Sequence, residues 1–122
     1  MNLKYQFDEI SIQEYLEGEL ISTIKHEYID GQVYAMAGAS VNHNRIVANL
    51  VGELRSALRN TPWEPFASDM KVRVADDFFY PDVTVVCHQE SNDYGVTDKP
   101  IIIIEVLSKT TRKNDHALKR LA

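Results

Sequence analysis

Two short runs of β-branched residues, each carrying one acid, constrain this chain most strongly. Asp82 stands in Tyr-Pro-Asp-Val-Thr-Val-Val, and Glu105 stands in Ile-Ile-Ile-Ile-Glu-Val-Leu-Ser. Runs of this kind predict buried strands. A lone carboxylate in a buried strand costs several kcal/mol unless it is paired or bound to a metal. The chain is therefore predicted to build a sheet in which Asp82 and Glu105 are candidates for chemistry.

Length and composition indicate one globular domain that spans residues 1–122. The chain has 122 residues, of which 44% are apolar, an ordinary composition for a folded domain. No apolar run approaches the roughly 20 residues that cross a bilayer, and the N-terminus lacks the apolar centre of a secretory signal. We therefore expect no membrane segment and a cytoplasmic location. A single cysteine, Cys87, excludes an intrachain disulfide and a cysteine-rich zinc site.

The net charge of −5 argues against a nucleic-acid partner, but its distribution weakens that objection. Residues 1–30 contain seven acids and two bases, so the acidic excess lies in the first part of the chain. A basic cluster near the C-terminus consists of Lys109, Arg112, Lys113, Lys119 and Arg120. A solvated helix face and a phosphate-contacting surface both remain open for this cluster.

Local signals predict a short helix and a hairpin in the first part of the chain. Ser11 and Glu14 have the spacing of a capping box for a helix over residues 12–17, which Gly18 is expected to end. The Asp30-Gly31 pair, flanked by β-forming residues, predicts a tight hairpin turn.

A longer helix and several strands are predicted further along. Apolar residues recur at helical spacing over residues 42–59, which predicts the main core-packing helix, capped by Ser40 or Asn42. Strands are predicted over residues 64–67, 70–75, 82–87 and 101–107, the last two central and covered on both faces. Residues 88–99 are predicted to form a loop. A last helix begins near residue 114 and is unfinished at Ala122, which suggests a C-terminally truncated domain.

If the strands that carry Asp82 and Glu105 are neighbours, both carboxylates can converge on one pocket. Two ionised carboxylates about 4 Å apart repel by roughly 4 kcal/mol at an effective dielectric constant of about 20. A divalent cation would compensate this repulsion, and hard oxygen ligands suit Mg²⁺ or Mn²⁺. The alternative is a pair of carboxylates that never meet, each bonded to an arginine or a strand-end amide.

Three other residues are candidates for the same site, each with an ordinary alternative. Lys119 can orient or deprotonate a water or neutralise a phosphate, although a terminal-helix lysine is usually solvated. Glu27 can add a third carboxylate or form a surface ion pair. His43, at the first turn of the long helix, is as compatible with a capping or partly buried histidine as with a functional one.

Taken together, these motifs resemble one family. His26-Glu-Tyr-Ile-Asp-Gly-Gln-Val, Asn42-His43, Tyr80-Pro-Asp-Val-Thr-Val-Val, and Ile104-Glu-Val-Leu-Ser-Lys-Thr-Thr-Arg followed by Asp115 and Lys119 occur in order over nearly the whole chain. In this the chain is similar to the Uma-two family of restriction-endonuclease-like proteins, a branch of the PD-(D/E)XK nuclease superfamily.

The resemblance implies an α/β (α+β) restriction-endonuclease-like core, a central mixed sheet flanked by helices, with an N-terminal helix and hairpin. It also implies hydrolysis of DNA phosphodiester bonds, with Asp82 and Glu105 as ligands of Mg²⁺ or Mn²⁺ and Glu27 as an additional acid. The sequence departs from the superfamily pattern at Leu107, where the same-strand lysine is expected, and Lys119 on the following helix is the implied substitute.

Two functions follow from this resemblance. The first is a metal-dependent DNA endonuclease with Asp82, Glu105, Lys119 and Glu27 in its site, in which a homodimer would supply two sites for two strands. The second is a catalytically inactive module that kept the fold and acts in nucleic-acid or protein binding, which the absent same-strand lysine favours.

Overall fold

The N-terminal part of the fold consists of one helix and one hairpin, both set by local sequence signals. The structure is a computed structural model that describes residues 9–107. Helix α2 (Ile12–Ile21) begins at the predicted capping box, in which Ser11 Oγ accepts the Glu14 N–H and the Glu14 carboxylate accepts the Ser11 N–H. The hairpin of β1 (His26–Ile29) and β2 (Gln32–Ala35) turns at Asp30 and Gly31, as predicted, with φ of 51° and 77°. Both residues adopt the left-handed conformation that this tight turn requires.

The predicted end of α2 at Gly18 is wrong, because the helix continues to Ile21. A glycine inside a helix costs only about 1 kcal/mol, and tertiary contacts outweigh that cost here. Tyr15 and Leu16 are buried, and the Glu19 carboxylate accepts hydrogen bonds from the start of β1, so the last turn is held from outside the helix.

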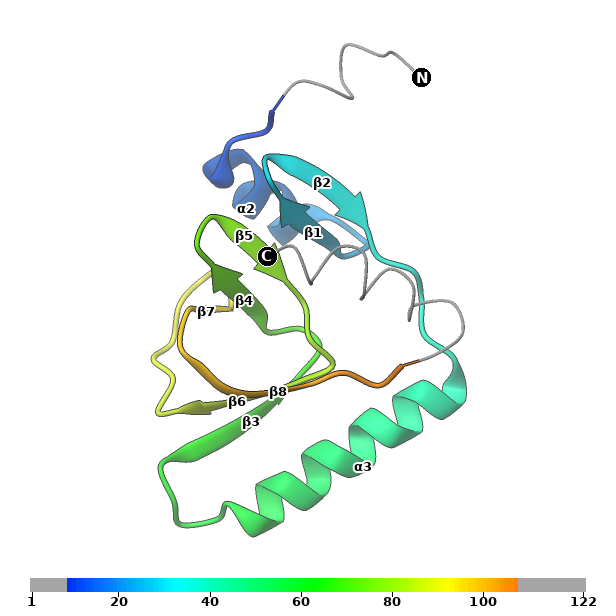
Figure 1. Ribbon diagram of the computed structural model, residues 1–122, viewed down its shortest axis with the longest axis vertical. Helices are drawn as coiled ribbons and strands as arrows, with labels where there is room; N and C mark the ends of the chain where they lie inside the picture. The colour runs from blue at the N-terminus through cyan, green and yellow to red at the C-terminus, as the bar shows by residue number, and fades with distance from the viewer. Residues whose placement is uncertain (1–8, 108–122) are drawn as a thin grey trace.

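Helix α3 (Val41–Ala57) occupies nearly the predicted residues, and Ser40 is its cap. Its expected role as the main core-packing helix is wrong for the part of the chain that the structure describes. Val47 is its one buried residue there, whereas Ile46 is 47% exposed. Figure 1 shows the reason: α3 runs along one end of the molecule beside β3, so only one narrow side of it meets the sheet.

The strands divide between two sheets. A five-stranded mixed sheet has the order β2-β1-β5-β4-β7, in which β4 and β7 are parallel and the other neighbours antiparallel. A three-stranded antiparallel sheet has the order β3-β6-β8. The strands after the hairpin are β3 (Trp63–Ala67), β4 (Lys71–Val74), β5 (Asp77–Phe79), β6 (Val83–Cys87), β7 (Val96–Thr97) and β8 (Pro100–Ile104).

Two of these strands were not predicted, and one was placed wrongly. β5 lies between two predicted strands, in a segment for which no structure was predicted, and β7 lies inside the predicted loop 88–99. Both gain their regular structure from pairing with β4. β8 was expected to be central and to reach Leu107, but it ends at Ile104 and is an edge strand of the described residues. Ile101, Ile102 and Ile103 are about half exposed, at 52%, 48% and 45%.

The core nearest the N-terminus is an aromatic cluster between α2 and the five-stranded sheet. The Tyr15 ring lies 5.0 Å from that of Tyr28 and 5.4 Å from that of Phe78, measured between ring centres. These distances are those of favourable aromatic pairs. The cluster fixes β1 and β5 side by side and so places Tyr80, which follows β5, next to Glu27 of β1.

Candidate functional site

Asp82 lies directly before β6, where its carboxylate is held from two sides. Oδ1 lies 2.9 Å from Nε2 of His43, and Oδ2 accepts the N–H of Val106 at 2.6 Å. The Asp82 side chain is 16% exposed and that of His43 is 12% exposed. Because an ionised carboxylate can only accept, His43 Nε2 carries the hydrogen and donates it when Asp82 is charged.

Glu105 directly follows β8, and β8 pairs with β6, which Asp82 directly precedes. The condition stated from the sequence, that the strands of the two acids are neighbours, is therefore met. In the β6–β8 pairing, Val83 is opposite Ile104. The ladder ends at this pair: Asp82 directly precedes Val83, Glu105 directly follows Ile104, and the Val106 amide that bonds Asp82 belongs to the residue after Glu105. Glu105 is half-buried.

The charges at this position are compensated in part by the protein itself. His43 and the Val106 amide both hydrogen-bond to the Asp82 carboxylate. This matters because nearby carboxylates repel each other in a partly buried site. The alternative, in which each carboxylate is bonded to an arginine or a strand-end amide, holds for Asp82, whose Oδ2 accepts the Val106 N–H.

The donor set fits a hard cation with few protein ligands. Among residues 9–107, no three His, Cys, Asp or Glu side chains stand together as metal ligands. Mg²⁺ is commonly held by one or two carboxylates and keeps several waters. A carboxylate has about four acceptor positions, so Asp82 retains capacity beyond its two hydrogen bonds. Asp82 and Glu105 therefore suit Mg²⁺ or Mn²⁺ better than a cation that needs a closed cage of side chains.

Glu27 lies on β1 and is 6% exposed, and its carboxylate accepts the N–H of Tyr80 at 3.1 Å. Tyr80 stands two residues before Asp82, so Glu27 contacts the segment that leads into the site. The hydroxyl of Tyr80 donates to Glu19 Oε2 at 2.8 Å. Tyr80 is thus held at its backbone by one acid and at its ring by another, which fixes the entry to β6.

Glu19 is the centre of this supporting network. Its side chain is 4% exposed, and its carboxylate bonds the His26 N–H at 3.0 Å and the His26 Nδ1 at 2.7 Å, in addition to the Tyr80 hydroxyl. Burial, followed by the hydrogen bond to Glu19, raises the pKa of Tyr80 far above its usual value. Burial likewise raises the pKa of Tyr15, whose hydroxyl donates to the His26 carbonyl. These tyrosines therefore stay neutral donors at ordinary pH.

Lys71 is a buried cation near the same tyrosine. Its Nζ lies 5.4 Å from the centre of the Tyr80 ring and donates to the Tyr94 carbonyl at 2.6 Å. Burial lowers the pKa of Lys71, while Glu19 and Asp69 act in the opposite direction. Lys71 contributes to the packing around Tyr80, and its ammonium group is already bonded to the backbone.

The sequence-predicted residues are distributed unevenly over the structure. Asp82 and Glu105 come from neighbouring strands, and Glu27 contacts the Tyr80 segment. Lys119 and the basic cluster that contains it lie outside the described residues. The sequence did not decide whether His43 is a functional histidine or a capping or partly buried one. The Val106 amide and Tyr80 were not predicted as parts of the site. The position of His43 at the head of a helix was the available signal, but its partner lies 39 residues away in the chain.

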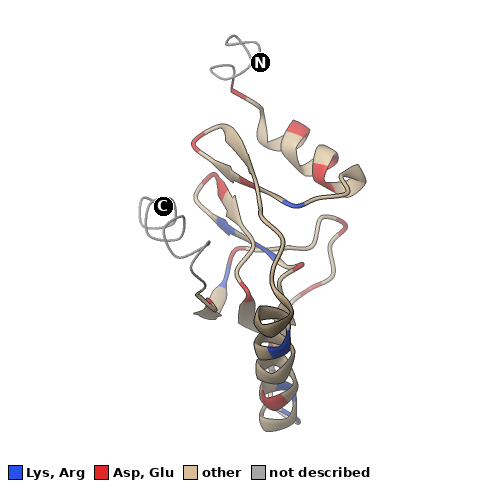
Figure 2. Cartoon of the chain, turned by 90° about the vertical axis from the view of Figure 1, so that its right-hand side faces the viewer, with Lys and Arg blue, Asp and Glu red and all other residues tan. Residues whose placement is uncertain are grey.

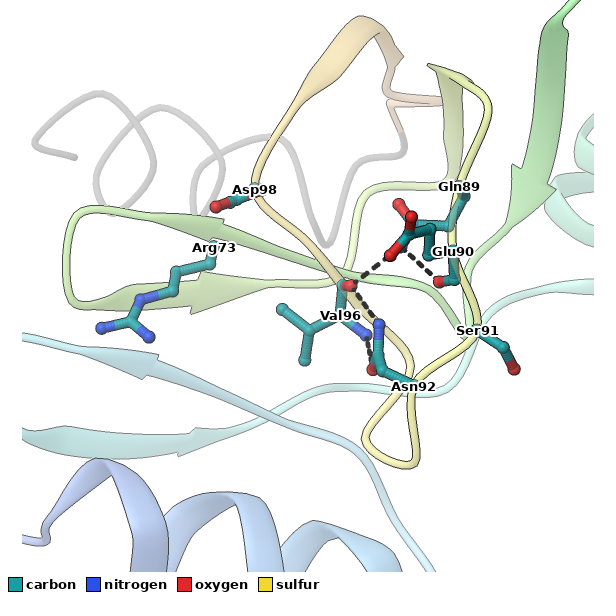
Figure 3. Close-up of a pocket in the computed structure, with 7 residues that line it drawn as sticks. All are labelled: Arg73, Gln89, Glu90, Ser91, Asn92, Val96 and Asp98. Atoms are coloured by element: carbon teal, nitrogen blue, oxygen red, sulfur yellow. Dashed lines mark hydrogen bonds between the residues drawn. The ribbon is translucent and has the colours of Figure 1, made fainter.

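A hollow on the surface lies apart from these residues. Figure 3 shows this pocket, with a volume of about 330 Å³, lined by Arg73, Gln89, Glu90, Ser91, Asn92, Val96 and Asp98. Its polar groups mainly bond its own loop: the Asn92 amide donates to the Val96 carbonyl at 2.8 Å and accepts the Val96 N–H at 2.9 Å. None of the acids predicted for the site lines this pocket.

Charge is distributed unequally over the described elements. Figure 2 shows acidic positions on α2 and at the turns of the sheet, and both signs of charge on α3. Arg45 and Arg55 belong to α3, the helix whose first turn carries His43. The acidic excess of the N-terminal part therefore does not extend along the helix that reaches Asp82.

Comparison with solved structures defines the class of fold. The chain is similar to a crystal structure described as "a putative nuclease belonging to DUF820" from Anabaena variabilis ATCC 29413, with a TM-score of 0.72 and 18% sequence identity. The match covers 88% of this chain and 63% of that one. The chain therefore shares the fold of that structure, and the α+β fold with a mixed sheet, an N-terminal helix and a hairpin is as predicted.

The chain belongs to the Uma2 family, described as "Putative restriction endonuclease", whose model matches residues 12–122. This confirms the resemblance drawn from the motifs. Two relatives from Synechocystis sp. are uncharacterized proteins: sll1609 is 38% identical over 105 residues, and slr1290 is 35% identical over 116 residues. These matches cover 81% and 93% of this chain, but the chain spans only 59% and 61% of those relatives.

None of the helices of residues 9–107 is both long enough and apolar enough to cross a bilayer.

Proposed function

We propose that this protein is a metal-dependent endonuclease that hydrolyses DNA phosphodiester bonds, with Mg²⁺ or Mn²⁺ held by Asp82 and Glu105. The observation that carries the proposal is the hydrogen bond from the Val106 amide to Asp82, together with the β6–β8 register. Both features support a site in which the Asp of the Pro-Asp motif and the acid that follows β8 act together. Membership of a family described as restriction endonucleases and the nuclease-like fold support the same function.

The residues of the chain take distinct parts in this proposal. Asp82 and Glu105 supply oxygen ligands, and Glu27 acts as an additional acid that also holds the backbone of Tyr80. Lys119 would neutralise a phosphate or orient the attacking water. When bound, the metal would stabilise charge on the phosphate and lower the pKa of a water. A homodimer in the cytoplasm, with one site for each DNA strand, completes the proposal.

The alternative is a catalytically inactive module that binds nucleic acid or protein. Leu107 favours it, because the residue two places after Glu105 is apolar where the nuclease superfamily carries a lysine. Fold alone does not establish activity. The alternative predicts binding that is independent of divalent cations.

Cleavage of supercoiled plasmid tests the two functions. The wild type is incubated with Mg²⁺ or with Mn²⁺, beside Asp82→Asn, Glu105→Gln and Lys119→Ala, and Asp93→Asn serves as a matched change on an exposed loop. We expect nicked or linear plasmid with the wild type and with the Asp93 variant, and little cleavage with the other three. Cleavage that persists in Asp82→Asn would reject the site, and absence of cleavage with either cation would favour the inactive module.

A further inference from the structure

We propose that His43 is a positioning residue of the Asp82 site, and this inference rests on the proposed metal-dependent function. The Nε2–H of His43 holds Oδ1 of Asp82 at 2.9 Å while the Val106 amide holds Oδ2 at 2.6 Å. The two donors come from different elements, the first turn of α3 and the segment after β8. Together they fix the plane of the carboxylate and leave its remaining acceptor positions for a cation.

The backbone from which the His43 side chain extends is itself held in place. The backbone N–H of His43 donates to Ser40 Oγ at 3.1 Å, which is the cap of α3. The imidazole therefore extends from a capped helix turn and, with 12% exposure, has little freedom to rotate. A donor anchored in this way orients Asp82 without contacting the substrate or the cation.

The Val106 contact alone would leave the carboxylate free to pivot about one hydrogen bond. Donors to a metal-binding carboxylate are part of the metal site, and their loss lowers metal affinity or activity by about 10- to 100-fold. His43 therefore supplies the second point of attachment. This role explains why a histidine at a helix start faces an acid on a strand, instead of pointing into solvent as most side chains of α3 do.

The substitutions His43→Gln and His43→Asn, which differ by one carbon, separate this role from helix capping and packing. In His43→Gln the amide nitrogen can lie close to the place of Nε2, whereas in His43→Asn the side chain is one carbon shorter and falls short of Oδ1. His43→Leu fills the site without a donor. His88→Asn is the matched control, because His88 lies exposed at a positive φ of 52° that asparagine tolerates.

The primary measurement is the affinity for Mn²⁺ by isothermal titration calorimetry, with the midpoint of thermal unfolding recorded for every variant. We expect His43→Asn and His43→Leu to bind Mn²⁺ about 10- to 100-fold more weakly and His43→Gln to stay within about threefold of the wild type. The control should bind as the wild type does. If His43→Leu does not fold, the Mn²⁺ affinities of His43→Gln and His43→Asn still show whether the donor to Asp82 matters.

The outcomes separate the positioning role from the proposed function. If the wild type binds Mn²⁺ and cleaves plasmid, but His43→Asn binds Mn²⁺ equally well, only the role of His43 is overturned. If affinities fall in proportion to thermal stability in all three variants, His43 is structural and the inference is likewise overturned. If the wild type neither binds Mn²⁺ nor cleaves, the proposed function fails and the role of His43 falls with it.

Discussion

Thr84 offers an unusual test, because replacing it with valine should stabilise the protein. The residue lies on β6, two positions after Asp82, and is fully buried with 0% exposure. Its hydroxyl oxygen has no hydrogen-bond partner in the described part of the chain. A buried polar group without a partner costs about 1–3 kcal/mol. Valine has nearly the same shape and suits a strand equally well, so it removes the cost without opening a cavity.

Thr97 is the matched control, because it is also a buried strand threonine but its hydroxyl is used. It is 3% exposed, and its Oγ1 accepts the Lys99 N–H at 3.3 Å. Thr97→Val should therefore lose about 1 kcal/mol, and Thr84→Val should gain about 1 kcal/mol, in the free energy of unfolding. Each substitution replaces a threonine hydroxyl with a methyl group. The two differ mainly in whether that hydroxyl made a hydrogen bond.

Urea unfolding followed by circular dichroism measures both changes. We expect the midpoint of Thr84→Val to rise at an unchanged denaturant slope, which indicates a change in stability alone. Its melting temperature should rise by roughly 4 °C. A Thr84→Val protein that is as destabilised as Thr97→Val would show that the Thr84 hydroxyl makes a stabilising contact, and the reasoning from burial would be refuted.

Three further substitutions test the supports of the site. Tyr80→Phe removes the hydroxyl that bonds Glu19 and should cost about 1.5–3 kcal/mol in urea unfolding, since the acceptor is a buried carboxylate; an unchanged midpoint would contradict this. Burial raises the pKa of Tyr80 above its unfolded value of about 10. The contribution of the neutral Tyr80 to stability is therefore complete below about pH 10 and is lost progressively as the pH rises above about 10. Wild-type stability should therefore fall more steeply above pH 10 than that of Tyr80→Phe. Gly31→Ala should destabilise by about 1–2 kcal/mol, because φ is 77° and the new Cβ would lie 3.0 Å from the Glu9 side chain, whereas Gly38→Ala, with open space around it, should change little. Ser40→Ala removes the cap of α3 and should cost about 1 kcal/mol, seen as a lower melting temperature; equal melting temperatures would exclude a capping contribution.

Local features of the fold were predictable because their determinants lie within a few residues of one another. The capping box of α2, the Asp30-Gly31 turn and the Ser40 cap each depend on contacts over at most four positions. The extent of α2 past Gly18 was not predictable in this way, since the contacts that hold its last turn come from His26 and Tyr80. β7 was missed for the same reason, because two residues form a strand only by pairing with β4.

The two acids of the candidate site were proposed from the sequence and stay a prediction, whereas their surroundings could not be inferred from it. Asp82 and Glu105 stood out because each follows or opens an apolar strand, where a carboxylate needs compensation. Their compensating donors could not be inferred, because Val106 lies 24 residues and His43 lies 39 residues from Asp82 in sequence. Lys119, predicted from the family motif, remains a prediction.

By itself the sequence determined which segments are helices, turns and most of the strands, and it singled out two acids as candidates for a site. Those properties arise from short-range capping, turn conformation and side-chain alternation, which any short segment of chain expresses. Only the tertiary structure decided that the strands form two sheets, that β8 lies at an edge, and that His43 meets Asp82. These depend on strand pairing and on helix placement, where the energy comes from residues far apart in the chain and no local pattern specifies the partner.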